Sequence, residues 1–377
     1  MKEIYLDNSA TTKVSEKAAN TAFEVMTKYY GNPSSLHRKG IEAEQIMENA
    51  RDKICSAMGG KNGHLFFTSG GTEGNNLALI GGALSKKRRG NKIVVSAYEH
   101  DSIMESAKYL EEEGFNVLYL LPDENGLITP DAIKNTVDKN TILVSIMTVN
   151  NEIGAINDIA SLVKAAKTMN PDVLFHTDAV QAFGKTPVFA DKWGVDLMTV
   201  TAHKINGPKG VGGLWIRKGI HIVSRQFGGE QENKMRPGTQ AMPLIAAFGT
   251  ASEDAFADLS NFMKKMDCLK ERLIEGIKDV PGAVINSRQP SVGAISNISI
   301  PGIRSEILLH FLEEKGIYVS SGSACSLGAK SHVLRAMGYD ESRVDSALRI
   351  SMGRDNKEED IDELVSALKE ASKKLCR

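Results

Sequence analysis

Cysteine is scarce in this chain of 377 residues, which contains only Cys55, Cys268, Cys325 and Cys376, far apart from one another. None of them belongs to a C-x-x-C pair, which argues against a disulfide framework and against a zinc site. We therefore expect no metal ion, and a reducing compartment suits the chain best.

Long apolar runs and an excess of one charge are also lacking. No run approaches the roughly 18–20 apolar residues that a membrane span needs, and the N-terminus, MKEIYLDNSATT, becomes polar within a few residues. We therefore expect a cytoplasmic protein without a membrane partner. The 46 Lys and Arg residues against 47 Asp and Glu give a formal net charge of -1. No strong field would recruit nucleic acid, so the expected partner is a small molecule.

Seven short runs of apolar or β-branched residues predict strands, with helical patterns between most of them. The runs lie at 64–67, 92–97, 115–121, 141–149, 173–177, 196–201 and 211–216. This alternation is typical of an α/β protein with a mostly parallel, doubly wound sheet. After Gly228 the pattern changes to a long helical segment at about 241–279, short strands at 293–300 and 317–320, and a closing helix. We expect a large α/β domain followed by a smaller α+β domain.

The segment FFTSGGTEGNNLALI (66–80) predicts a strand, a glycine-containing turn and the start of a helix. The backbone N–H groups of Ser69 to Thr72 would then lie at the positive end of a helix, which favours an anion. The segment matches neither G-x-G-x-x-G nor the P-loop pattern, so it indicates neither a dinucleotide nor a nucleoside triphosphate. A single phosphate on a small cofactor is the economical interpretation, although a tight turn needs the same glycines for steric reasons.

Polar residues follow four of the predicted strands: His100, Asn151, Asp178 and Lys204. Each has a plainer explanation on its own, such as a loop histidine, a helix cap or a surface charge. Together they indicate one crevice, because ligands of open α/β sheets bind beyond the carboxyl ends of the strands. A phosphate site, an amine for a Schiff base and a carboxylate for a ring nitrogen suit pyridoxal phosphate.

The order of these features resembles that of the cysteine desulfurases, which are fold-type I pyridoxal-phosphate enzymes of the class V aminotransferase group. The matching motifs cover nearly the whole chain: DNSATT (7–12), GNPSS (which contains Asn32), TSGGTEGNN (68–76), EH (99–100), NNEIG (150–154), TDAVQAFGK (177–185), AHKINGPKG (202–210), RPGT (236–239) and SGSACS (321–326). The last is the most specific. The resemblance implies conversion of L-cysteine to L-alanine, with transfer of the sulfur to Cys325 as a persulfide.

The resemblance also implies how the cofactor is held. Lys204 would form the Schiff base, Asp178 would pair with the pyridine nitrogen, and His100 would stack on the ring and act as a base. The other expected cofactor contacts are Gln181 and Asn151 near the phenolic oxygen, and Gly71, Thr72, Thr201 and His203 at the phosphate.

Further residues extend the expected site toward the substrate and a second chain. Arg349 would clamp the substrate carboxylate, for which a fork of donors is suited, and Asn32 would also contact the substrate. Thr239 would reach a phosphate across a dimer interface, which implies a homodimer. The resemblance implies that the thiol of Cys325 is the nucleophile, and the small residues around it would permit it to reach the cofactor and then move outward. The alternative is a buried structural cysteine after a strand.

The expected domains are 14–249, which binds the cofactor, and 1–13 with 250–377, which carries a mobile cysteine loop at about 321–332. The segment CSLGAKSHVLRAMG, which begins at the cysteine, looks shorter than the loop of the iron–sulfur cluster members that carry this motif, so the sulfur acceptor stays open between a cluster scaffold, a tRNA-thiolation enzyme and a cofactor pathway. Two other functions also stay open. One is selenocysteine cleavage or another class V reaction in which Cys325 is dispensable, and the other is a non-catalytic sulfur carrier or scaffold.

Overall fold

The computed structural model describes residues 3–322 and 331–375 and is built around a seven-stranded sheet. Its strands are β2 (Gly63–Thr68), β3 (Lys92–Ser96), β4 (Asn116–Leu120), β5 (Thr141–Ser145), β6 (Leu174–Asp178), β7 (Leu197–Thr201) and β8 (Gly212–Arg217), in the order β2-β8-β7-β6-β5-β3-β4. β8 is antiparallel to both of its neighbours, and the other pairs are parallel. The mostly parallel α/β sheet and its seven strands, predicted from the apolar runs, are confirmed.

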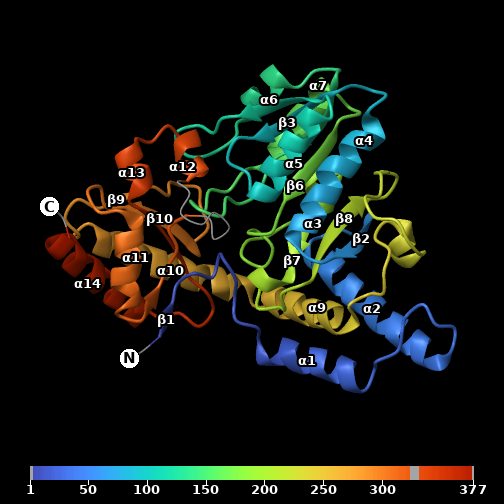
Figure 1. Ribbon diagram of the computed structural model, residues 1–377, viewed down its shortest axis with the longest axis horizontal. Coiled ribbons are helices and arrows are strands. Elements are labelled where there is room, and N and C mark those ends of the chain that lie inside the picture. Colours follow the sequence, from blue (N-terminus) through green and yellow to red (C-terminus); the bar gives the residue numbers. More distant parts are fainter. Residues whose placement is uncertain (1–2, 323–330, 376–377) are drawn as a thin grey trace.

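The central strands lie between two layers of helices. Every residue of β5, β6 and β7 is buried, which explains why these strands appear in the sequence as nearly continuous apolar runs. Figure 1 shows α3, α4 and α5 crossing the sheet. The helices of this part are α3 (Gly71–Asn76), α4 (Gly82–Lys86), α5 (Asp101–Glu112), α6 (Pro130–Thr136), α7 (Ile159–Met169) and α8 (Ala190–Trp193), with a π-helical turn at Leu77–Gly81 between α3 and α4.

Two long helices replace the single one expected at 241–279. They are α9 (Met242–Ala257), which packs against α1 (Glu16–Thr27) and α2 (Arg38–Ala57), and α10 (Leu259–Ile277). They meet at Asp258, whose backbone is not helical (φ -116°, ψ 15°) and whose side chain accepts hydrogen bonds from Asn261 and Arg354. The apolar pattern runs through the break because both helices bury apolar side chains, so the pattern could not reveal it.

The C-terminal elements form a second body that includes the start of the chain. β1 (Ile4–Tyr5) pairs in parallel with β11 (Ile317–Tyr318), and β12 (Ala347–Ser351), β10 (Ile295–Ser299) and β9 (Val284–Ile285) form an antiparallel sheet. Figure 1 shows the blue N-terminal strand among these orange and red elements. The remaining helices are α11 (Ser305–Glu313), α12 (His332–Ala336), α13 (Glu341–Asp345) and α14 (Glu358–Leu375). The two short strands and the closing helix are confirmed, and the domain boundaries stay a prediction.

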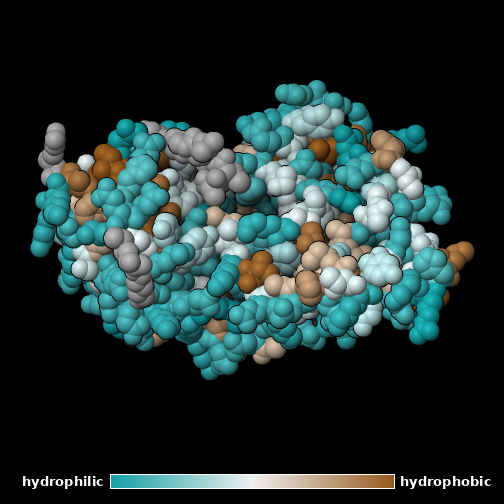
Figure 2. Space-filling model, turned by 60° about the horizontal axis from the view of Figure 1, so that its bottom comes forward, coloured by the Kyte–Doolittle hydropathy of each residue, from teal (hydrophilic) through white to brown (hydrophobic). Residues whose placement is uncertain are grey.

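The surface is mainly hydrophilic, with small hydrophobic patches on the face shown in Figure 2. Among residues 3–322 and 331–375, no helix combines the length and the apolar character that crossing a membrane requires. Two large apolar side chains are almost fully exposed, Leu36 in the turn between α1 and α2 (97%) and Phe227 in the segment between β8 and α9 (94%).

Candidate active site

A cavity of about 270 Å³ lies at the carboxyl ends of β5, β6 and β7 and beside the first turn of α3. Ten of the residues predicted for the site line it: Gly71, Thr72, His100, Asn151, Asp178, Gln181, Thr201, His203, Lys204 and Arg349. They come from segments almost 280 residues apart in the sequence, so the fold gathers them at the edge where parallel strands end.

Lys204 is held at the cavity by the DNSATT segment. It ends the short 3-10 turn that follows β7, and its Nζ donates to the carbonyl oxygens of Ser9 (2.5 Å) and Ala10 (2.7 Å). Both of these residues also line the cavity. The lysine amine therefore lies where it can react with the aldehyde of a bound cofactor.

Asp178, the last residue of β6, presents a buried carboxylate to the cavity. Its Oδ2 accepts a hydrogen bond from Asn75 Nδ2 (2.7 Å), and its Oδ1 accepts one from the backbone N–H of Val180 (2.9 Å). Asn75 lies in the motif TSGGTEGNN, but the sequence reasoning gave it no role of its own. The available signal in the sequence was a polar residue directly after Gly74, in the predicted start of the helix.

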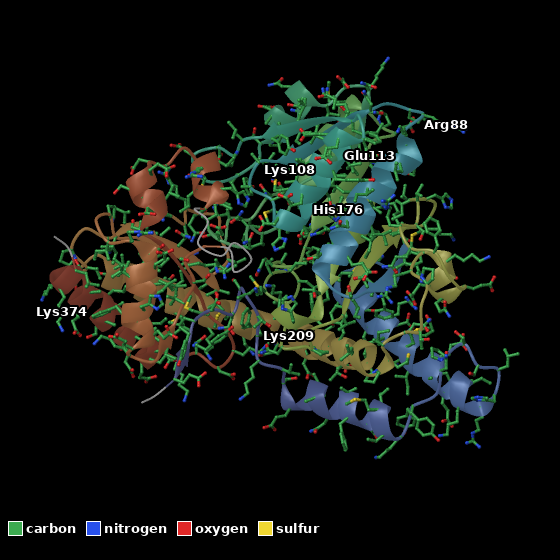
Figure 3. All side chains as sticks on the ribbon, viewed as in Figure 1. Arg88, Lys108, Glu113, His176, Lys209 and Lys374 are labelled. Atoms are coloured by element: carbon green, nitrogen blue, oxygen red, sulfur yellow. The ribbon has the colours of Figure 1, made fainter. Side chains whose placement is uncertain are left out.

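The histidine two residues before Asp178 is neutral. His176 lies inside the molecule (Figure 3), with Nδ1 2.9 Å from Ser145 Oγ and Nε2 3.0 Å from Thr199 Oγ1. Burial lowers the pKa of His176 to about 3. A neutral imidazole on the same face of β6 leaves the negative charge of Asp178 available for a cationic ring nitrogen.

Fewer of the predicted backbone N–H groups are available at the phosphate end of the site. The N–H of Ser69 donates to Glu73 Oε2 (2.7 Å), whereas Gly71 and Thr72 line the cavity. A side chain at Gly71 would lie 2.9 Å from Val180, and one at Gly74 would lie 2.8 Å from Thr199. These glycines are therefore needed for the close approach of α3 to the sheet, and the same approach brings its N-terminal turn to the cavity.

Thr201 and His203 extend this end of the cavity. Thr201 Oγ1 donates to the carbonyl oxygen of Val211 (3.1 Å), and His203 Nδ1 lies 3.3 Å from Thr11 Oγ1. Burial, followed by the charge of Lys204, lowers the pKa of His203 to about 3. A neutral His203 can donate one hydrogen bond to an anion without adding a second charge beside the lysine.

Arg349 joins the two bodies of the molecule at the cavity. From β12 its Nη1 donates to the carbonyl oxygen of Asn151 (3.3 Å) and its Nη2 to Asp7 Oδ1 (2.8 Å). The residue is 1% exposed, and its Nε has no hydrogen-bond partner among the described residues. A buried cationic donor at a cavity wall suits a carboxylate ligand.

Two predicted residues lie away from this cavity, and a third is not described. Asn32 is exposed in the turn after α1, where its Oδ1 accepts from the N–H of Ser34 (2.9 Å), and Thr239 is exposed between β8 and α9. Neither lines the cavity of its own chain. Cys325 and most of the predicted loop at 321–332 lie outside the described residues.

The described chain on both sides of the cysteine segment lies beside the cavity wall. Before it, Ser320 and Arg349 exchange two backbone hydrogen bonds (3.2 and 2.7 Å). After it, Ser331 Oγ donates to Glu152 Oε2 (2.5 Å), and a side chain at Gly322 would lie 3.6 Å from the same oxygen. Burial raises the pKa of Glu152. This carboxyl group, next to Asn151, thus anchors the flank after the cysteine segment and lies close to Gly322 on the flank before it.

Residues 4–364 match the family model of the class V aminotransferases. The chain belongs to this family, whose members depend on pyridoxal phosphate. Among its relatives, a protein of Methanosarcina thermophila named cysteine desulfurase IscS is 39% identical over 378 residues, which cover 99% of this chain and 93% of that protein. A solved structure described as a NifS-like protein has a TM-score of 0.92 at 37% identity and covers 98% and 99% of the two chains. Another, described as SspA in complex with cysteine, has a TM-score of 0.81 at 29% identity and covers 93% and 98%.

The residues of the cavity fit pyridoxal phosphate. Lys204 offers an amine for its aldehyde, Asp178 a carboxylate for its ring nitrogen, and the first turn of α3 a place for its phosphate. Ser9 Oγ and Arg349 Nε are buried without partners among the described residues, as expected of polar atoms that serve a bound molecule. The cofactor supplies an electron sink when it is bound.

Proposed function

We propose that this chain is a cysteine desulfurase that converts L-cysteine to L-alanine and transfers the sulfur to Cys325 as a persulfide. The observation that carries the proposal is the meeting of Lys204, Asp178 and Arg349 at one cavity. These side chains supply the covalent attachment, the partner of the ring nitrogen and the clamp for an amino-acid carboxylate. The relative from Methanosarcina thermophila, which carries this name, supports the same substrate.

His100 forms one wall of the site in this proposal. It precedes α5, and its Nδ1 accepts a hydrogen bond from the N–H of Ser102 (3.1 Å) and lies 2.9 Å from Ser102 Oγ. These contacts fix the plane of the imidazole, so that it covers the cofactor ring and can move a proton at the substrate. Asn151 and Gln181 contact the cofactor on the side of its phenolic oxygen.

Cys325 receives the sulfur. The C–S bond of the substrate breaks and an S–S bond forms on the enzyme thiol, so that cysteine and a thiol become alanine and a persulfide without an external oxidant. The anchoring of Ser320 at Arg349 and of Ser331 at Glu152 supports this role, because one flank of the cysteine segment is tied to a residue that lines the cavity and the other to the neighbour of the cavity-lining Asn151. The persulfide then passes to an acceptor protein, either a cluster scaffold or a tRNA-thiolation enzyme.

The active assembly in this proposal is a homodimer in which Thr239 contacts the phosphate held by the other chain. Two observations support it. Thr239 is exposed and does not line the cavity of its own chain, and Leu36 and Phe227 are almost fully exposed apolar side chains that an interface would cover. Sedimentation at working concentration tests this assembly, and a fully active monomer would contradict it. The cytoplasmic location stays a prediction.

The direct test of the proposed activity measures alanine and sulfide formed from L-cysteine in the presence of a thiol reductant. We expect turnover by the wild-type protein and none by Lys204→Ala, which should also lose covalently held cofactor because it lacks the reacting amine. Parallel assays with selenocysteine and other amino acids distinguish the alternative class V reactions. Efficient turnover of selenocysteine alone would favour a selenocysteine lyase, and a purified protein without bound-cofactor absorbance would favour a non-catalytic scaffold.

A further inference from the structure

A second lysine is buried behind the cofactor site. Lys185, the last residue of TDAVQAFGK, is 6% exposed, and its Nζ donates to Gln181 Oε1 at 2.5 Å. Burial, with Lys204 and Arg349 nearby, holds the pKa of Lys185 well below its usual range. Lys185 does not line the cavity, so any effect that it has on the cofactor must pass through a neighbour.

The neighbour is a buried amide with a different partner at each end. Gln181 is 4% exposed, and its Nε2 donates to the carbonyl oxygen of Ser9 at 3.0 Å while its Oε1 accepts from Lys185. Reversal of the amide would place its oxygen against the carbonyl oxygen of Ser9 and would remove the acceptor of Lys185. The pair of contacts therefore selects one orientation, with the donor end of Gln181 on the side of Ser9 and the cavity.

We infer that Lys185 is a positioning residue that holds the side-chain amide of Gln181 so that its N–H group faces the phenolic oxygen of pyridoxal phosphate. The inference rests on the proposed contact between Gln181 and the cofactor. A donor at this oxygen stabilises its negative charge, and a carbonyl oxygen at the same place would repel it. Lys185 thus determines whether Gln181 presents a donor or an acceptor to the phenolic oxygen, without itself contacting the cofactor.

A second buried lysine, Lys270, has a purely structural set of contacts and can be compared with Lys185. Lys270 of α10 is 4% exposed and donates to three oxygens, Ser291 Oγ (2.6 Å) and the carbonyls of Val292 (3.0 Å) and Ile295 (3.2 Å). It ties α10 to the loop before β10 and to the first residue of β10, and it does not line the cavity. Among the described residues, Lys185 Nζ has Gln181 as its one acceptor.

The test is the visible spectrum of the holoenzyme as a function of pH. In Lys185→Met we expect the pH midpoint of the cofactor's absorbance change to rise by about one unit, which corresponds to the loss of a hydrogen bond to a charged oxygen. The midpoint rises because the form with the more negative phenolic oxygen loses its donor. Gln181→Leu should give the same rise, and the double variant should give no more than Gln181→Leu alone, because both changes remove one contact. Lys270→Met, the matched control, should lower the thermal midpoint and leave the absorbance midpoint unchanged.

Two results would overturn the inference. One is an unchanged absorbance midpoint in Lys185→Met when Gln181→Leu shifts it, and the other is a double variant in which the two shifts add. If Gln181→Leu itself leaves the midpoint unchanged, the proposed contact of Gln181 fails, and the role of Lys185 fails with it, whereas alanine production by the wild type would still support the proposed reaction. Should Lys185→Met not fold, Lys185→Gln keeps a side-chain donor and is expected to show a rise smaller than that of Gln181→Leu. An equal rise would contradict the inference.

Discussion

The buried ion pair between Arg51 and Glu232 should contribute strongly to the stability of the folded protein. The guanidinium and the carboxylate share two hydrogen bonds (2.9 and 3.0 Å), their side chains are 6% and 2% exposed, and Glu232 Oε2 also accepts the N–H of Phe67 (2.9 Å). Glu232 begins three consecutive residues with positive φ (47°, 53° and 64°) in the segment that carries Thr239. The pair therefore fastens a strained turn of that segment to α2 and β2.

Replacement of Glu232 by Gln leaves the buried guanidinium without its main counter-charge. Loss of one partner of a buried pair costs about 3–5 kcal/mol, and we expect the lower end because Glu48, which is about half exposed, also contacts Arg51 (3.1 Å). For a chain of 377 residues this corresponds to a fall of about 4 °C in the thermal midpoint. Calorimetry or circular dichroism of the holoenzyme measures it.

The matched control is an exposed pair. Glu358→Gln removes a contact with Arg272 (2.6 Å) in which both side chains are about half exposed, and it should leave the midpoint unchanged within error. Arg51→Met combined with Glu232→Met should lose less stability than the two single changes added, because no charge is left buried. A Glu232→Gln protein as stable as the wild type, or strictly additive losses in the double variant, would refute this reasoning.

Two further predictions concern the residues around Asp178. His176 is protonated below about pH 6.5 in the unfolded chain but stays neutral in the folded chain until about pH 3, so its contribution to stability is lost as the pH falls through this range. Between pH 6.5 and 4.5 the free energy of unfolding should therefore fall by about 2–3 kcal/mol less in His176→Gln than in the wild type. Urea denaturation at each pH measures this difference. Equal falls in the two proteins would contradict the prediction. Asn75→Ala removes a 2.7 Å hydrogen bond to the carboxylate of Asp178 and should weaken cofactor binding about tenfold in an absorbance titration of the apoprotein. An unchanged affinity would show that Asn75 does not support Asp178.

The sequence predicted the parts of the structure that follow from local pattern. Each strand of the main sheet is a short apolar run, and His100, Asn151, Asp178 and Lys204 lie at one cavity because the ends of neighbouring strands share an edge. The order of strands and helices was sufficient to predict that these residues lie close together.

Contacts that depend on distant partners could not be predicted in this way. Asn75 meets Asp178 across 103 residues, and Arg51 meets Glu232 across 181 residues, with no periodic signal in either pair. The break at Asp258 was hidden because the apolar pattern continues through it, and one partner of its side chain, Arg354, lies 96 residues away. Such partners are fixed by packing, which composition and periodicity do not encode.

The most direct test of the central claim separates cofactor chemistry from sulfur transfer at Cys325. After addition of L-cysteine, mass spectrometry of the wild-type protein should find one added sulfur on Cys325 together with alanine. Cys325→Ser should keep the cofactor absorbance and its change with cysteine, yet form no persulfide and almost no alanine, because a hydroxyl is far less ionised than a thiol near neutral pH. A stoichiometric persulfide on Cys55, Cys268 or Cys376 in this variant, with undiminished alanine production, would contradict the account.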